Sequence, residues 1–233
     1  MDILIFDLRA SLAHFRRPDT TSTHATYPFI TRTALRGLLG AVIGVEQWPE
    51  EGWAGLQLLR PVATRVQQLS LLGKGFLESG STFNRPTTVE LVIQPHYRIF
   101  YTGANMEELA QRIRQRQAVY HTYLGSAFAA VVPEFVAVVP GASLDAQAGQ
   151  EIEISTVVPT DAITAIAPEP GLTFNRVGGL LYQAWPHRRF SGTIHLLYEQ
   201  RNQSYRATLS GPAALHPVIF AAVRHSPGYI ALW

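Results

Sequence analysis

The pattern of apolar and polar positions changes period several times within the first 50 residues. An unbroken apolar, β-branched run over Ile3–Leu8 is typical of a buried strand. Apolar residues at three- and four-residue spacing then predict a helix over Ala34–Gly44. Thr31 or Thr33 is placed to cap its first N–H groups, and the final glycine is suited to ending it.

Two long segments with strand character follow, Leu58–Leu72 and Thr87–Tyr101. A glycine-rich stretch separates them, so they are predicted to form one long hairpin with a protruding tip, a thumb at about residues 72–90. Asn105 is a candidate cap for a second helix over Met106–Tyr120, and Phe128–Val139 is a further apolar strand candidate.

The predicted order over residues 1–140 is therefore β, α, β, β, α, β. This is the split βαβ arrangement of ferredoxin-like and RRM-type domains, whose sheets often bind RNA on one face. Residues 141–233 are expected to form a β-rich C-terminal appendage with short strands punctuated by Gly and Pro: 151–158, 180–184, 193–198 and 204–209. The fold class is thus predicted to be α+β.

The composition favours a chain that functions as a subunit of a complex. Apolar residues make up 47% and charged residues only 15%, against roughly 25% charged in average chains. The net charge is +2, and Lys74 is the only lysine among 19 basic residues. Arginine pairs bidentately with phosphate and stacks on bases, which favours nucleic-acid contacts. A GC-rich genome or a heat-adapted host would enrich arginine as well, so this signal alone leaves both explanations open.

The sequence disfavours several classes of protein. Cysteine is absent, which excludes disulfides and cysteine-bound zinc. No apolar run approaches the roughly 18 residues of a membrane helix. The first residues, Met1–Asp7, are acidic where a signal peptide is basic, so the chain is expected to be cytoplasmic.

The first candidate site is a basic, aromatic stretch that leads into the first predicted helix. Helix starts bind phosphates through free N–H groups, and aromatic rings stack on bases. We expect RNA contacts here from His14, Phe15, Arg16, Arg17, Tyr27, Arg32 and Arg36. The alternative is a solvated loop whose aromatic rings pack inward as anchors.

Two further stretches are weaker candidates. Lys74, Phe83 and Arg85 lie at or beside the glycine-rich tip. This tip is suited to clamping a nucleic-acid backbone; the alternative is a plain hairpin turn. Arg188 and Arg189 lie between two predicted strands, where they would meet nucleic acid, a neighbouring subunit or only solvent.

Signals for catalysis are few. The eight histidines form neither a helical His-x-x-x-His pair nor an HExxH motif, and Gly-x-Ser-x-Gly is absent, so no metal, cofactor or nucleophile-elbow hydrolase is expected. Metal-independent RNA cleavage needs a general base, a general acid and a cation. His14, His24, Tyr27 and Arg36 could supply these groups, which leaves an endoribonuclease as the alternative function.

Two motifs resemble a known family. The stretches His14-Phe15-Arg16-Arg17, Thr26-Tyr27-Pro28 and Thr31–Gly44, and later Tyr123-Leu124-Gly125-Ser126, resemble the CRISPR-associated "Cas-five" subunit of type I Cascade complexes. The resemblance covers residues 1 to about 140 and is strongest to the subtype I-B form, including forms carried by transposons.

Membership would imply the RAMP-superfamily ferredoxin-like fold with a thumb hairpin. It would also imply that the chain binds the 5′ handle of the guide RNA (crRNA) and caps one end of the backbone filament. The expected partners are crRNA, the filament subunit and the large PAM-reading subunit, with target DNA nearby and, in transposon-borne systems, transposition proteins. The expected role is antiviral defence or transposon-associated RNA-guided DNA targeting, without catalysis.

One branch of the family, subtype I-C, cleaves precursor crRNA with a Tyr, Lys and His set. Here the only lysine, Lys74, is followed by Gly75 rather than by histidine. That departure disfavours the nuclease. A third possibility is a purely structural subunit whose basic loops meet acidic protein surfaces.

Overall fold

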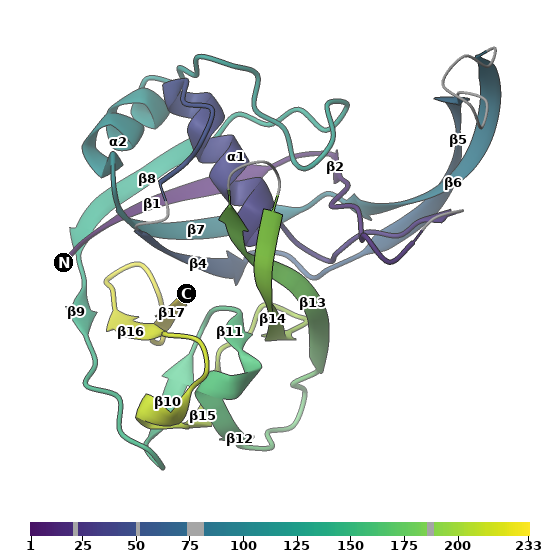
Figure 1. The fold of residues 1–233 in the computed structure, drawn as a ribbon. Coiled ribbons are helices and arrows are strands. Elements are labelled where there is room, and N and C mark those ends of the chain that lie inside the picture. The colour runs from purple at the N-terminus through teal and green to yellow at the C-terminus, as the bar shows by residue number, and fades with distance from the viewer. Residues whose placement is uncertain (21–22, 50–51, 74–81, 186–188) are drawn as a thin grey trace.

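The computed structural model describes residues 1–20, 23–49, 52–73, 82–185 and 189–233, and it has an α+β fold with more strand than helix (Figure 1). A four-stranded sheet forms its centre, in the order β4-β7-β1-β8, with every neighbouring pair antiparallel. The elements of this part are β1 (Asp2–Arg9), α1 (Arg32–Ile43), β4 (Gly52–Leu58), β7 (His96–Gly103), α2 (Met106–Arg114) and β8 (Glu134–Pro140).

The apolar run at the start of the chain is buried because β1 is covered on both faces. Leu4 and Phe6, both 0% exposed, belong to the main core, which also contains the apolar stripes of α1 and α2. Ile3 and Ile5 point to the opposite face, where they pack in a second cluster with residues near the C-terminus. A strand buried on both sides reads as continuous rather than alternating, which confirms its sequence-based prediction.

The predicted limits of the first helix are also confirmed. The Thr31 side chain accepts a hydrogen bond from the N–H of Ala34 at 3.2 Å and so caps the helix. Gly44 ends it in the left-handed conformation, with φ of 85°.

The predicted long hairpin is wrong in its division. The chain breaks near Pro61 and again at Pro95, where Gln94 takes a positive φ of 49°. Proline cannot donate to a strand ladder, and the second predicted strand is cut in two at Pro95, so that His96–Gly103 joins the central sheet as β7. The first predicted strand begins only at Thr64, and Leu58 belongs instead to β4, a strand of the central sheet that was not predicted.

The remaining parts of that hairpin form a separate ribbon of β5 (Thr64–Gly73) and β6 (Phe83–Ile93) that extends away from the body (Figure 1). It is longer than the thumb expected at 72–90. Two short strands pair with β6 near the body: β2 (Leu12–Ala13) antiparallel and β3 (Thr23–His24) parallel. These pairs attach the N-terminal loop to the base of the ribbon.

Two other boundaries differ from the prediction. The second helix ends at Arg114 rather than Tyr120, since Arg116 takes a positive φ of 54°, and Asn105 precedes it without a side-chain cap. The following strand begins at Glu134, after Pro133, instead of at Phe128.

In its described residues, the C-terminal part has three small sheets and the 3₁₀ turns Thr160–Ala162 and Gly211–Ala213. All four predicted segments contain strands, although the first is divided. The sheets are β10 (Glu151–Ile154), β15 (Tyr205–Leu209) and β12 (Ile163–Ile166); β11 (Val158–Pro159), β14 (Arg189–Glu199) and β13 (Phe174–Trp185); and β9 (Ala142–Ser143), β16 (Ile219–Ala222) and β17 (Ile230–Leu232).

The last strands were not predicted, and they return to the central sheet. The N–H of Trp233 donates to the carbonyl of Ala54 in β4 at 3.0 Å. The main core contains residues from both sides of position 140, so the division into 1–140 and 141–233 remains a prediction about sequence organisation.

Gly125 lets two distant loops meet. The N–H of His14 donates to the carbonyl of Leu124 at 3.1 Å, and Gly125, with φ of +82°, lies directly against the His14 carbonyl. A Cβ at this position would overlap that oxygen and the ring of Phe15. Both stretches that carry the family resemblance are therefore in direct contact.

We predict that Gly125→Ala lowers the free energy of unfolding by about 3 kcal/mol or more. The backbone strain of a positive φ and the steric overlap of the new Cβ both destabilise the folded state. The matched control is Gly149→Ala, which has nearly the same φ of +81° and open space around the Cβ position. It should cost only about 1 kcal/mol. Thermal unfolding of both variants measures the difference, and equal losses would contradict the close approach.

Candidate nucleic-acid interface

His14 positions the basic loop from inside the protein. Its side chain is buried, and its Nδ1–H donates to the backbone carbonyl of Glu90 at 2.8 Å. The carbonyl can only accept, so the proton is assigned to Nδ1. Burial lowers the pKa of His14, and nearby Arg16 lowers it further, against the opposing effect of the Glu90 hydrogen bond. The imidazole is therefore neutral near pH 7.

His24 lies beside it, with ring centroids 6.3 Å apart and planes 21° from parallel. The pKa of His24 is lowered by burial first, then by the charge of Arg16, by His14 when it is protonated, and by the charge of Arg85. The charges of Arg16 in the loop and Arg85 in β6 both act on His24, and the pairing of β3 with β6 at Thr88 and Val89 holds His24 against the ribbon. We call Arg16, His24 and Arg85 the ribbon-foot cluster.

The ribbon-foot cluster is accessible. Both arginines are exposed, and His24 is partly exposed. Phe83, 49% exposed, lies two positions before Arg85 on β6 and therefore on the same face of the ribbon. Positive groups held together repel one another, and a bound phosphate would relieve this repulsion.

Glu90 and Thr26 hold the loop in place. The Glu90 carboxylate accepts from the N–H of Thr26 at 3.1 Å, and the Thr26 hydroxyl accepts from the N–H of Phe15 at 2.9 Å. The backbone groups of the loop are thus satisfied within the protein, so its exposed side chains project from a defined frame.

The expected stacking of bases on Phe15 and Tyr27 is wrong. Phe15 is 3% exposed and packs against Tyr97, with centroids 6.5 Å apart. Tyr27 is 7% exposed, and its hydroxyl donates to the carbonyl of Gly179 at 3.1 Å. Burial raises the pKa of Tyr27. Both rings anchor the loop, which is the alternative that the sequence left open.

The other predicted arginines have partners inside the chain. Arg17 pairs with Asp19 at 2.7 Å and lies over the ring of Tyr27, at 5.8 Å from its centroid. The guanidinium of Arg32 lies 5.0 Å from the ring centroid of Tyr182 in β13. Arg36 donates to the carbonyl of Pro49 at 3.0 Å. The contacts of Arg32 and Arg36 attach α1 to its neighbours, whereas those of Arg17 stay within the loop.

The remaining three predicted RNA-binding residues lie outside the described residues, either entirely or in their side chains. Lys74 and Arg188 lie outside the described residues. Arg189 begins β14 and pairs with Trp185, and its side chain lies outside the description.

Arg65 is a candidate that the sequence did not suggest. It is exposed on β5 and pairs with Leu91, six positions from Arg85, so it shares a face of the ribbon with Arg85. Its place on that face follows only from the strand register, which the sequence alone does not give. Among the described residues there is no group of three metal-ligating side chains, and no helix is long and apolar enough to cross a membrane.

Comparison with solved structures places this architecture among CRISPR proteins. A CRISPR protein from Archaeoglobus fulgidus matches with a TM-score of 0.57 and 12% identity, over 99% of this chain and 98% of that one. A chain of a CRISPR RNA-guided surveillance complex matches with a TM-score of 0.55 and 12% identity, over 91% and 92%. At such identities the likeness concerns the α+β fold alone.

The sequence itself identifies the family. The family model described as CRISPR-associated protein (Cas_Cas5) matches residues 3–154. The chain belongs to this family, as the sequence motifs indicated. No curated protein matches the sequence.

The pH dependence of stability tests the burial of His14. Its ordinary pKa is 6.5, and the folded value is lower, so the unfolded chain binds more protons just below pH 6.5. Stability should therefore fall as the pH drops from about 7 to 5. In His14→Gln, denaturant unfolding should give a smaller fall, while His225→Gln, at an exposed site, should keep the original dependence. An unchanged dependence in His14→Gln would contradict a buried neutral imidazole.

Proposed function

We propose that this chain is a non-catalytic crRNA-binding subunit of a type I CRISPR Cascade complex, most similar to subtype I-B. It holds the 5′ handle of the guide RNA and caps one end of the backbone filament beside the large PAM-reading subunit. The complex acts in the cytoplasm, in antiviral defence or transposon-associated DNA targeting. The observation that carries the proposal is the pairing of β3 with β6, which holds the basic loop of Arg16 and His24 against the ribbon that bears Arg85.

The chemistry of the cluster suits single-stranded RNA. Arg16 and Arg85 can each pair with a phosphate, and His24 adds a hydrogen-bonding ring. Phe83 offers the accessible ring face that Phe15 and Tyr27 do not, and a splayed base stacks on such a ring. Target sequence would be read by base pairing of the guide.

The proposed framework is a ferredoxin-like domain with β5 and β6 as its thumb. Support comes from the antiparallel order β4-β7-β1-β8, with one helix after the first strand and another after the third. The ribbon exposes large apolar side chains, Val66 at 63% and Leu72 at 75%. Exposed apolar groups on a projecting ribbon suit contact with a neighbouring filament subunit.

Removing both exposed arginines tests the site. We expect Arg16→Ala plus Arg85→Ala to weaken binding of handle RNA roughly tenfold or more and to reduce its log–log salt slope by about 1.4. Titrations at several salt concentrations measure both quantities.

The control is Arg201→Ala plus Arg224→Ala, which removes the same charge from exposed positions in the C-terminal part. It should change the affinity little. If the two double variants behaved alike, the ribbon-foot cluster would not be the RNA site.

An endoribonuclease is the second candidate, favoured by the two adjacent imidazoles of His14 and His24. Cleavage needs both a base and an acid at the scissile phosphate, but His14 is 6% exposed with Nδ1 engaged, and the Tyr27 hydroxyl is bound to Gly179. We therefore expect intact repeat RNA after incubation in chelator. Specific cleavage that His24→Ala abolishes would establish the enzyme instead.

A further inference from the structure

The two edges of the central sheet differ in whether other parts of the chain form backbone hydrogen bonds with them. The outer edge of β4 is covered, because Trp233 donates to Ala54 at 3.0 Å and Val157 donates to Leu56 at 2.8 Å. Within the described part of the chain, β8 pairs with β1 alone. Alternate N–H and C=O groups of β8 therefore point outward, where an added strand would find them.

Between Glu134 and Pro140, the open edge carries no charged residue. Phe135–Val139 consists of apolar residues, and Val138 is 40% exposed. A register shift opposite Ile5 and Phe6 marks a bulge, beyond which Ala137–Pro140 pairs regularly. Edge strands that carry neither lysine nor inward-pointing charge are sites of strand addition.

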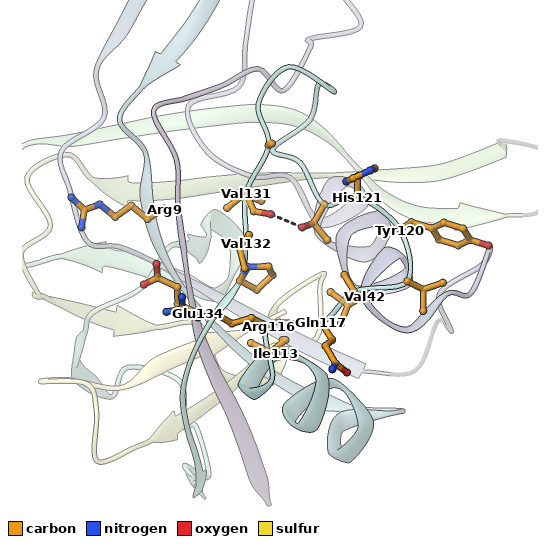
Figure 2. Close-up of a pocket in the computed structure, with 15 residues that line it drawn as sticks. Arg9, Val42, Ile113, Arg116, Gln117, Tyr120, His121, Val131, Val132 and Glu134 are labelled. Carbon is orange, nitrogen blue, oxygen red and sulfur yellow. Dashed lines mark hydrogen bonds between the residues drawn. The ribbon is translucent and has the colours of Figure 1, made fainter.

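The N-terminal end of β8 leads into a hollow of about 630 Å³. Figure 2 shows Val131 and Val132 on one side of it and Gln117 and His121 on the other. Apolar side chains line much of it: Val42, Ile113, Val119, Val131, Val132 and Pro133. A space of this size and lining accepts an apolar side chain with its neighbours.

The charged groups around the hollow are mostly basic. Arg9 and Arg116 line it together with one acid, Glu134. Just beside it, the guanidinium of Arg114 lies 4.3 Å from the ring centroid of Phe135. An occupant with acidic side chains at this end would complement these charges.

We infer that β8 and the adjoining hollow bind an extended segment of a protein partner. Its backbone pairs with the outer edge of β8, an apolar side chain enters the hollow, and an acidic side chain lies near Arg9 and Arg116. A polypeptide fits because its N–H and C=O groups alternate at the spacing of the edge, which a nucleic-acid backbone does not offer. The inference rests on the proposed function, since the partner is another protein subunit of the complex.

Hydrogen–deuterium exchange tests this in three states: the chain alone, the chain with guide RNA only, and the complex assembled from co-expressed Cascade subunits. The amide of Val138, which points away from β1, should exchange at least about tenfold more slowly in the assembled complex than in the other two states. Equal protection with RNA alone would assign the edge to nucleic acid and overturn the inference. Concentration-dependent protection of the chain alone would assign it to a second copy, with the same consequence.

Competition for assembly gives a second measurement. Val138→Lys places a charge on the edge and should be incorporated at no more than about a tenth of the unsubstituted level. The control Leu215→Lys changes an apolar side chain that is 85% exposed elsewhere, and it should compete fully. Failure to assemble or to bind RNA would overturn the proposed function together with this inference. Assembly with a freely exchanging β8 would overturn the inference alone.

Discussion

The position of the basic loop depends on three contacts made by one residue, His14. Its N–H binds the carbonyl of Leu124, its own carbonyl lies against Gly125, and its ring donates to Glu90. The N-terminal loop, the loop before β8 and the base of the ribbon are therefore held together at a single point. A side chain on residue 125 would separate the first two, and loss of the imidazole would release the third.

This anchoring determines which groups remain for a ligand. Phe15 and Tyr27 are used to fix the loop, so the proposed RNA contact depends on charge and on the exposed ring of Phe83. Contacts to phosphates carry little sequence information and weaken with salt. A subunit of this kind would hold its RNA by backbone and shape, within an assembly that supplies further contacts.

Local patterns in the sequence predicted the elements well and their tertiary use less well. The strand at Ile3–Leu8 and the helix between Thr31 and Gly44 follow from periodicity and capping, which are local properties. The division of the hairpin at Pro61 and Pro95 was missed, because period-two patterns continue on both sides of each break.

In the candidate site too, the sequence indicated residue types better than their tertiary arrangement. Arg16 and Arg85 were recognised by residue type, yet only the pairing of β3 with β6 shows that the loop lies against the ribbon. Phe15 and Tyr27 were misassigned because an aromatic ring beside arginines has the same sequence signature whether it binds a base or fills a core.

The central claim, that the loop and the ribbon form one surface for single-stranded RNA, is tested most directly by photo-crosslinking. Guide RNA with a photoreactive uridine at successive handle positions would be crosslinked to the chain, and the attached peptides identified by mass spectrometry. The account predicts crosslinks from neighbouring handle positions to both the Arg16–His24 segment and the Phe83–Thr88 segment. Crosslinks confined to the C-terminal sheets, with none at either segment, would contradict it.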